Sequence, residues 1–372
     1  MTEFSHTDHQ HMARAIQLAR RGRYTTHPNP NVGCVMVRDG KVLAEGWTQP
    51  VGGAHAEIHA LQQVNYQAEG AEVYVTLEPC AHFGRTPPCS DALIKAKVKR
   101  VVAAMVDPNP QVSGRGLLKL QQAGVQTAQG LLENEARQLI PGFISAMTRQ
   151  RPFVRIKMAM SLDGRTAMAS GESVWITGAA ARQDVQFWRA RAGAVLTGIG
   201  TVLMDKPSLN VRLTPEQLGI HDSVRQPDRV ILDAKLQFPE DAPLLQHEGI
   251  VRIYTCSEDS AKIARLQQQG VIIRQFSGDR PELNAVLSAL YDDGITEVHV
   301  EAGATLTGSL VEAGLADELL IYMAPCLMGS TARPLFQLPF EHMQERLALD
   351  IRDMRAIGSD WRILAGIQAV QA

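Results

Sequence analysis

The sequence feature that most constrains this chain is a group of metal-ligand residues between positions 55 and 89. His55 begins the tripeptide His-Ala-Glu, and Cys80 and Cys89 enclose a segment that contains Gly-Arg-Thr-Pro-Pro. One imidazole and two thiolates are three ligands for a tetrahedral zinc ion, and they leave the fourth position open for water. Glu57 is a nearby carboxylate that can transfer protons. His-x-Glu, then Pro-Cys and a second cysteine, is typical of zinc deaminases.

Other interpretations of these residues are weaker. Two unrelated cysteines and a surface histidine would not explain why Glu57 and the prolines before each cysteine stand in register. His59 lies one helical turn after His55, but a fourth protein ligand would displace the reactive water, so we expect an ordinary helix residue. Cys34 lies within a predicted strand and is expected to pack in the core. The sequence therefore predicts one zinc site of three ligands.

Composition limits the class of protein. A chain of 372 residues is too long for one ordinary core and predicts two domains. Hydrophobic content of 45% and charged content of 20% are typical of a soluble globular enzyme. The net charge of −2 gives no basic surplus for nucleic-acid binding, and no apolar run is long enough for a membrane span. The five cysteines are scattered, and no signal peptide is visible, so we expect a cytoplasmic protein.

The first half alternates strands and helices. Thr7-Asp8 can cap a first helix, Asp39-Gly40 is a strong hairpin turn, and His55 is expected to open a helix whose first turn carries Glu57. Predicted strands at residues 72–77 and 100–106 flank the loop of Cys80 and a helix that begins near Cys89. A helix N-terminus favours the thiolate that zinc requires. This order predicts a three-layer α/β/α domain.

The boundary between the halves is expected near residue 148, where Pro141-Gly142 and the polar run 148–152 interrupt the pattern. The predicted domains are residues 1–147 and 148–372. In the second half, the segment 297–306 is a strand that enters a helix through a turn of small residues. Free backbone N–H groups in such a turn can bind a phosphate, although a plain packing turn explains the segment equally well.

The insert between Cys80 and Cys89 resembles one family, the bifunctional riboflavin-biosynthesis deaminase/reductases. The second half resembles the same family in four stretches, at residues 161–166, 169–177, 200–212 and 301–306, so the resemblance covers nearly the whole chain. It implies a cytidine-deaminase-like domain followed by a dihydrofolate-reductase-like α/β domain. It also implies Zn²⁺ and NADPH as cofactors and small pyrimidine nucleotides as substrates. A homo-oligomer is expected.

The resemblance implies three groups of site residues. Zinc is expected on His55, Cys80 and Cys89, with Glu57 as the catalytic acid/base. NADPH contacts are expected at Ala159, Trp175, Thr201, Asp205, Ala234, Gly303, Ala304, Thr305, Leu306, Thr307, Gly308 and Ser309. The resemblance implies substrate contacts at Ser173, Arg189, Leu209, Arg212 and Glu301. In the deaminase half, the candidates for binding the base and the phosphate are Asn29, His82 and Arg85, and plain loop residues remain the alternative for Asn29 and His82. Arg189 and Arg212 also suit phosphate on chemical grounds, because a guanidinium fork matches phosphate oxygens.

The chain departs from the family pattern at three positions. Thr48 stands where a histidine is common, Lys206 where a second aspartate is usual, and Ala234 where a hydroxyl residue can occur. Any cofactor contact at Ala234 would therefore use the backbone. Two other functions share the zinc motif: a nucleic-acid base deaminase, which the neutral charge and the long second half disfavour, and a zinc-stabilised binding module, which would normally close the metal with a fourth ligand.

Overall fold

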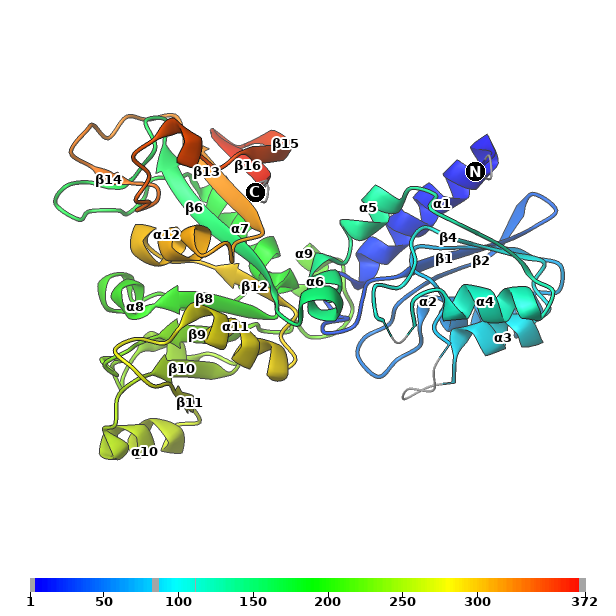
Figure 1. The fold of residues 1–372 in the computed structure, drawn as a ribbon, viewed down its shortest axis with the longest axis horizontal. Helices are drawn as coiled ribbons and strands as arrows, with labels where there is room; N and C mark the ends of the chain where they lie inside the picture. Colours follow the sequence, from blue (N-terminus) through cyan, green and yellow to red (C-terminus); the bar gives the residue numbers. More distant parts are fainter. Residues whose placement is uncertain (1–3, 82–86, 111, 368–372) are drawn as a thin grey trace. The chain divides into compact units, whose positions relative to one another are not determined.

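The computed structural model describes residues 4–81, 87–110 and 112–367. The chain divides into two compact units, residues 1–150 with 215–223, and residues 151–214 with 224–372 (Figure 1). Each unit has its own sheet and its own buried core. Within the described residues, none of the helices has the length and apolar character needed to cross a membrane.

The first unit is a five-stranded sheet between two layers of helices. Its strands are β1 (Gly33–Arg38), β2 (Lys41–Trp47), β3 (Glu72–Val75), β4 (Arg100–Ala103) and β5 (Gln126–Gln129). Its helices are α1 (His6–Ala19), the 3₁₀ turn Arg20–Gly22, α2 (Ala56–Gln63), α3 (Cys89–Lys95), α4 (Arg115–Gln122), α5 (Glu133–Arg137), α6 (Pro141–Arg149) and α9 (Pro215–Leu218). The order β2-β1-β3-β4-β5 has β1 antiparallel to both neighbours and β3, β4 and β5 parallel.

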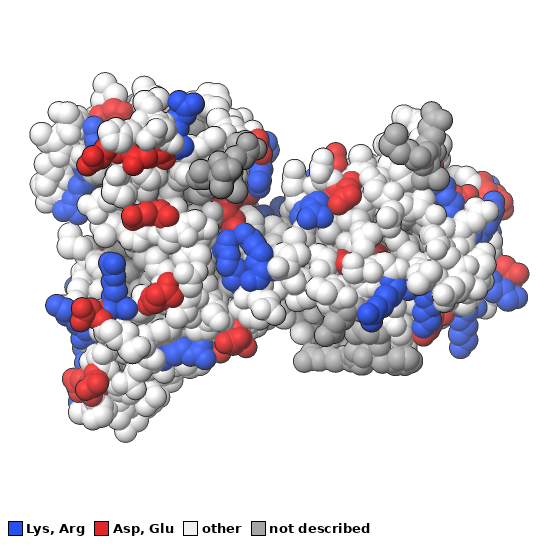
Figure 2. Space-filling model, in the orientation of Figure 1, with Lys and Arg blue, Asp and Glu red and all other residues white. Residues whose placement is uncertain are grey.

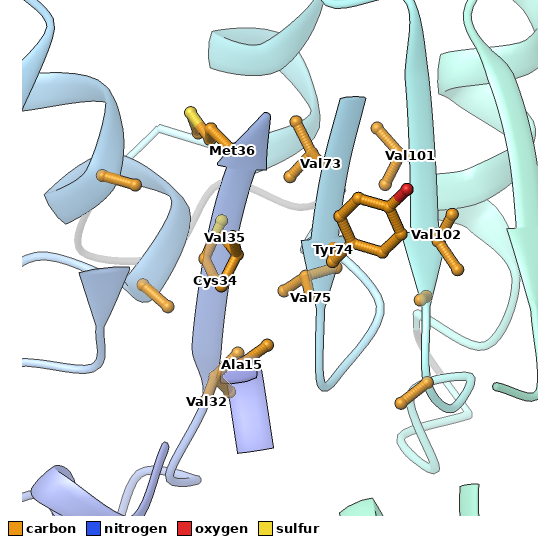
Figure 3. Close-up of a cluster of buried hydrophobic side chains, with 14 of the residues drawn as sticks. Ala15, Val32, Cys34, Val35, Met36, Val73, Tyr74, Val75, Val101 and Val102 are labelled. Carbon is orange, nitrogen blue, oxygen red and sulfur yellow. The ribbon is translucent and has the colours of Figure 1, made fainter. Parts of the chain in front are cut away.

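The core of this unit forms on both faces of the sheet. Helix α1 lies on one face, and α2, α3 and α4 lie on the other (Figure 1). Central strands of parallel or mixed sheets are buried on both faces, and the runs Cys34–Val37 and Val73–Val75 are correspondingly apolar. Figure 3 shows Met36, Val73 and Val101 at the same level on neighbouring strands, in agreement with the register. The predicted three-layer α/β/α arrangement is confirmed.

Helix α1 begins earlier than the sequence predicts. Ser5 is its N-cap, and Asp8 is the third helical residue, whose carboxylate accepts from the backbone N–H of Ser5 at 2.8 Å. The other carboxylate oxygen of Asp8 accepts from Arg100 at 2.7 Å and from Tyr74 at 2.7 Å. The expected Thr7-Asp8 cap is therefore wrong, because Ser5 and Asp8 form a reciprocal capping box. Asp8 instead ties α1 to the neighbouring strands β3 and β4.

We expect Asp8→Asn to lower the free energy of unfolding of this unit by about 1–3 kcal/mol at pH 7, since the amide nitrogen cannot accept hydrogen bonds. Burial opposes ionisation of Asp8, but Arg100 and Tyr74 outweigh it, so its pKa lies below the ordinary 3.8. The stabilisation is therefore complete above pH 4 and is lost as the pH falls through the folded-state pKa. Thermal unfolding at pH 7 and pH 3 measures this, with the exposed turn variant Asp39→Asn as control. An equal deficit at both pH values would contradict it.

Pro141-Gly142 is not the linker that the sequence predicts. These residues begin helix α6, which ends at Arg149, and the division between the units falls after Gln150. Proline is well tolerated in the first turn of a helix, because its missing N–H has no partner there in any case. The Pro-Gly pair, which suggests a turn in the sequence, therefore begins a helix in the structure.

The second unit is built on a nine-stranded sheet of order β11-β10-β9-β8-β12-β6-β13-β16-β15. Its strands are β6 (Phe153–Ser161), β8 (Ala194–Gly198), β9 (Asp228–Leu232), β10 (Val251–Thr255), β11 (Ile272–Gln275), β12 (Glu297–Val300), β13 (Glu318–Ala324), β15 (Leu349–Ile357) and β16 (Asp360–Ile367). A separate small sheet pairs β7 (Arg165–Ala167) with β14 (Arg333–Pro334).

The helices of this unit are α7 (Ala179–Arg191), α8 (Ile199–Asp205), α10 (Ser260–Gln268), α11 (Leu283–Asp292) and α12 (Ala304–Glu312), with 3₁₀ turns at Pro243–Gln246 and Met343–Glu345. The seven strands from β11 to β13 are parallel, and β16 and β15 add an antiparallel hairpin. In open parallel sheets, ligands bind beyond the carboxyl ends of the strands. At those ends lie Gly198, Asp233 and Glu301, each at or directly after the last residue of its strand.

Candidate active sites

The first candidate site is formed by His55, Cys80 and Cys89, whose ligand atoms all lie within 4.8 Å of one another. The His55 Nδ1 atom is 3.3 Å from the Cys89 sulfur and 3.8 Å from the Cys80 sulfur. A tetrahedral zinc with bonds of about 2.3 Å to sulfur and about 2.0 Å to nitrogen separates its ligand atoms by roughly 3.5–3.8 Å. The three donors therefore fit zinc in both chemical type and spacing.

Helix starts place two of the three ligands. His55 is the N-cap of α2, and Cys89 is the first residue of α3, as the sequence predicts to within one residue. Helix α2 packs directly on strand β2 at Gly46. The packing is so close that a Cβ atom at this position would lie 2.1 Å from the carbonyl oxygen of Ala56. The absence of a side chain at Gly46 thus allows the turn that carries His55 and Glu57 to lie against the sheet.

Glu57 lies in the first turn of α2 and is only 4% exposed. Burial, and next the Cys80 sulfur, raise the pKa of Glu57 to about 7. A bound divalent cation would lower this pKa again, since it favours the charged form. A carboxyl group with a pKa near neutrality can both accept and release a proton at physiological pH.

The two cysteines share one proton, because the hydrogen bond between their sulfurs lowers the pKa of Cys80 and raises that of Cys89. Hydrogen bonds from Cys89 and from the His55 ring lower the pKa of Cys80, so its sulfur is a thiolate at neutral pH. The backbone N–H of Cys89 also donates to the Cys80 sulfur at 3.2 Å. A preformed thiolate is the state that a zinc ligand requires.

Two further residues behave as ordinary structural side chains, as expected. His59 contacts the Trp47 ring edge-on at 4.6 Å, and its Nδ1 atom accepts from the Trp47 backbone N–H. Cys34 is fully buried in β1, and burial raises the pKa of its thiol well above the ordinary value. Among the described residues, His55, Cys80 and Cys89 form the one His/Cys/Asp/Glu group with metal-ligand spacing.

Sheet topology brings a second loop to the end of the sheet from which the Cys80 loop leaves. Strand β1 runs antiparallel to β3, so the residues before Gly33 lie beside the end of β3 that leads to Cys80. Asn29 is exposed in this loop, which Thr26 and Asn31 hold together through a side-chain hydrogen bond. The Thr48 hydroxyl is buried and accepts from the Val32 N–H at 3.0 Å. The threonine at this position therefore satisfies a backbone donor at the end of the loop. His82 and Arg85 lie outside the described residues.

The second candidate site surrounds Glu301, directly after β12. Arg189 binds Glu301 with two parallel hydrogen bonds, at 2.5 Å and 2.9 Å, and donates a third to the Asn210 carbonyl. Burial opposes ionisation of Glu301, but Arg189 outweighs it and holds the pKa below its ordinary range. Arg189 is thus engaged with protein groups, which favours a role in orienting Glu301. The side chain of Arg212 is exposed and remains the better candidate for a phosphate.

The sequence analysis missed Lys157. This lysine lies on β6, and the strand's alternation places it on the same face as Ala159, a predicted cofactor contact. Burial lowers the pKa of Lys157, Glu301 raises it and Arg189 lowers it further, with a net pKa below the ordinary value. The signal in the sequence was a lysine within the largely apolar strand Phe153–Ser161, where Arg155 is a second charge.

The predicted cofactor residues follow several neighbouring strands. Thr201 and Asp205 lie on α8 after β8, and Gly303 is the N-cap of α12 after β12. Ala234 lies after β9, and its carbonyl accepts from the Cys256 N–H at 3.0 Å. Trp175 is 72% exposed, with the Arg182 guanidinium 4.5 Å from the ring centre. Leu209 is buried, and Ser173 is half-buried near Trp175 in sequence.

Helix α12 borders an open surface pocket of ≈ 670 Å³. Thr305 and Ser309 line it from the helix, and Phe336, Gln337 and Leu338 line it from the facing loop. The other α12 residues differ in exposure: Thr307 is buried and its hydroxyl donates to the Gly303 carbonyl, while Gly308 lies against the Gln337 carbonyl. Ala304 and Leu306 belong to the first turn of the helix.

Comparison with known proteins covers both units. A family model described as the cytidine and deoxycytidylate deaminase zinc-binding region matches residues 5–105, and one described as the RibD C-terminal domain matches residues 152–363. The riboflavin biosynthesis protein RibD of Escherichia coli (strain K12) is 46% identical over 359 residues, which are 95% of this chain and 97% of that protein.

Solved structures agree over the same length. Acinetobacter baumannii RibD, form 1, has a TM-score of 0.89 at 45% identity and covers 98% of this chain and 99% of its own. A Thermotoga maritima protein, described as a diaminohydroxyphosphoribosylaminopyrimidine deaminase/5-amino-6-(5-phosphoribosylamino)uracil reductase, has a TM-score of 0.86 at 32% identity, with coverage of 98% and 99%.

Proposed function

Because this chain belongs to the RibD family of bifunctional riboflavin-biosynthesis enzymes, we propose that its two candidate sites catalyse successive reactions on one pyrimidine nucleotide. The chain is a deaminase and a reductase, and its cofactors are zinc and NADPH. Its folds are those expected, cytidine-deaminase-like and then dihydrofolate-reductase-like. We assign deamination to residues 1–147 and reduction to residues 148–372. The observation that carries the first assignment is the His55–Cys80–Cys89 cluster beside the buried Glu57.

The deaminase substrate is 2,5-diamino-6-ribosylamino-4(3H)-pyrimidinone 5′-phosphate. When bound by His55, Cys80 and Cys89, Zn²⁺ supplies a water whose pKa is lowered towards about 7. Glu57 would accept one proton from this water and pass it to the ring nitrogen, and it would then transfer the proton of the new hydroxyl group to the amino group, which leaves as ammonia. Asn29 lies in the loop before β1, at the end of the sheet that carries the Cys80 loop, and is the candidate for binding the base among the residues that the structure describes. His82 and Arg85 remain predictions for the base and phosphate.

The reductase substrate is 5-amino-6-(5-phosphoribosylamino)uracil. NADPH supplies the hydride when it is bound, along Ala159, Thr201 and the α12 turn. Hydride addition at the ribose C1′ breaks its bond to the ring oxygen, and that oxygen must then take up a proton. Lys157 is the candidate donor, because it is half-buried beside Glu301 and Arg189 and its pKa is lowered. Ser173, Leu209 and Arg212 complete the proposed substrate contacts.

On the face of each unit that Figure 2 shows, the described lysines and arginines are interspersed with aspartates and glutamates. We propose small molecules as the substrates and a homo-oligomer as the assembly. A cytoplasmic location is proposed as well, because all five cysteines are free and thiols are kept reduced in the cytosol.

One assay tests the whole proposal. The protein is incubated with the diaminopyrimidinone phosphate and NADPH, and ammonia release and the NADPH absorbance are followed together. We expect stoichiometric ammonia and NADPH oxidation, with ammonia appearing first. Ammonia release without NADPH oxidation, after the deaminated intermediate has accumulated, would refute the reductase assignment.

Removal of a ligand tests the zinc site. Cys89→Ser is expected to lose at least tenfold in zinc affinity and to have no measurable deaminase activity, because two ligands remain of three. Metal analysis after dialysis measures the zinc content, and Cys34→Ser serves as the matched control on a buried cysteine of the same unit. Full zinc retention in Cys89→Ser would exclude this ligand set.

The two sites are expected to fail independently, because each unit has its own core. Arg212→Ala is expected to lower kcat/KM for reduction by about 10–100-fold, the scale of one charged hydrogen bond, and to leave ammonia release intact. Arg280→Ala, at an exposed arginine of the same unit, is the control. If Arg212→Ala abolished deamination in a folded protein, a shared site would be the better explanation.

A further inference from the structure

Glu78 stands two residues before Cys80 and has no role in the chemistry described above. Glu78 is 3% exposed, and the hydrogen-bond partners that the structure gives its carboxylate include no lysine or arginine. It accepts from four backbone N–H groups: Asp107 at 3.0 Å, Gly114 at 2.9 Å, Gly116 at 2.8 Å and Leu117 at 3.3 Å. Three of these donors belong to the N-cap and first turn of α4, where the helix dipole also favours an anion.

The first turn of α4 also touches the ligand loop directly. A Cβ atom at Gly116 would lie 2.0 Å from the carbonyl oxygen of Pro79, the residue between Glu78 and Cys80. Gly114, the N-cap, has φ of 81°, a left-handed conformation that glycine adopts without strain. These two glycines let the helix start approach the backbone that precedes Cys80.

Cys80 is held from its other side as well. Its carbonyl oxygen accepts from the backbone N–H of Ser90 at 3.2 Å and from the Ser90 hydroxyl at 3.0 Å. Its backbone is therefore fixed by α4 on the N-terminal side and by α3 on the C-terminal side. A ligand whose backbone is fixed on both sides has its sulfur position set before metal binds.

We propose that Glu78 is a positioning residue for the zinc site, which holds the first turn of α4 against Pro79 and thereby fixes the Cys80 sulfur. This inference rests on the proposed zinc ligands. The carboxylate satisfies backbone donors on both of its oxygens, which an amide cannot do because its nitrogen is a donor. Partners outside the ligand sphere typically contribute 10–100-fold to metal affinity or activity.

A purely structural helix cap predicts something different. Such a cap would lower the unfolding temperature when removed and leave zinc affinity unchanged in the folded protein. Glu282 offers a matched control, because its carboxylate caps α11 through the backbone N–H groups of Asn284 and Ala285, in the other unit.

The experiment compares Glu78→Gln, Glu78→Asp, Glu282→Gln and Cys80→Ser in the full chain. Zinc affinity is measured by competition with a chromogenic chelator, and the ligand geometry by the visible spectrum of the cobalt-substituted protein. Unfolding temperature and the reductase rate on the deaminated intermediate report whether each unit is folded. We expect zinc affinity about tenfold weaker or more in Glu78→Gln, less weakened in Glu78→Asp, and unchanged in Glu282→Gln. The cobalt bands of both Glu78 variants shift, and deaminase kcat falls while KM stays constant.

Each outcome decides a separate point. Wild-type zinc affinity and cobalt spectrum in Glu78→Gln, with a lowered unfolding temperature, would overturn the inference and leave Glu78 as a helix cap. If Glu78→Gln fails to fold its unit, Glu78→Asp decides in the same way. Zinc retained by Cys80→Ser would instead refute the ligand set, whereas zinc lost from Cys80→Ser and unchanged in both Glu78 variants would refute only the positioning role.

Discussion

Glu57→Gln is expected to retain zinc and to lose deaminase activity by about 10²–10⁴-fold, or roughly 3–5 kcal/mol of transition-state stabilisation. Glutamine fills the same volume in the first turn of α2, so the fold and the ligands His55 and Cys89 remain in place. The amide cannot accept a proton from the attacking water. It also cannot deliver one to the ring nitrogen or to ammonia, so both halves of the reaction are slowed.

Three measurements make this prediction specific. Zinc content shows whether the ligands are intact, ammonia release reports deamination, and NADPH oxidation on the deaminated intermediate reports the second site. Only ammonia release is expected to change. Glu69→Gln, at an exposed glutamate of the same unit, is the control and is expected to match the wild type. Deamination within a few-fold of wild type in Glu57→Gln would mean that another group moves the proton.

Much of the first site could be predicted because it is local in sequence. His55 and Glu57 share one helical turn, and Cys80 and Cys89 flank one loop, so a linear motif contains the metal donors and the base. The sequence predicted a helix start at each of His55 and Cys89, since helix N-termini carry recognisable signals. The role of Thr48 was not predictable, because its hydrogen bond to Val32 joins residues that meet only when β1 and β2 pair.

The second site depends on contacts between distant residues, and the sequence predicted less of it. Arg189 and Glu301 are 112 positions apart and meet because α7 packs beside the end of β12. Arg189 alone resembled a free phosphate ligand, and only the paired geometry shows that its guanidinium is engaged. Strand β15 was missed for another reason. A register shift between Ile351 and Asp353 interrupts the alternation by which a strand is recognised.

Lys157→Met is expected to reduce the reductase rate by about 10²–10⁴-fold and to leave ammonia release unchanged. Methionine is unbranched and fills a similar space on β6, so the strand and its neighbour β13 are expected to pack as before. The thioether has no proton to give to the ribose ring oxygen when the C1′ bond breaks. The effect is expected in kcat, because the proton is transferred during the reaction and not on binding.

The pH dependence distinguishes a proton donor from a residue that only binds substrate. Burial lowers the pKa of Lys157, so its charged form is lost at a pH below the ordinary 10.5. Reduction by the wild type is therefore expected to decline as the pH rises through that lowered pKa, and the slow rate of Lys157→Met is expected to be flat across the same range. Lys262→Met, on helix α10 of the same unit, is the control. It should keep the wild-type reduction rate and the same decline of that rate with rising pH. A Lys157→Met enzyme with normal kcat and a raised KM would show that Lys157 binds the substrate and that the proton comes from elsewhere.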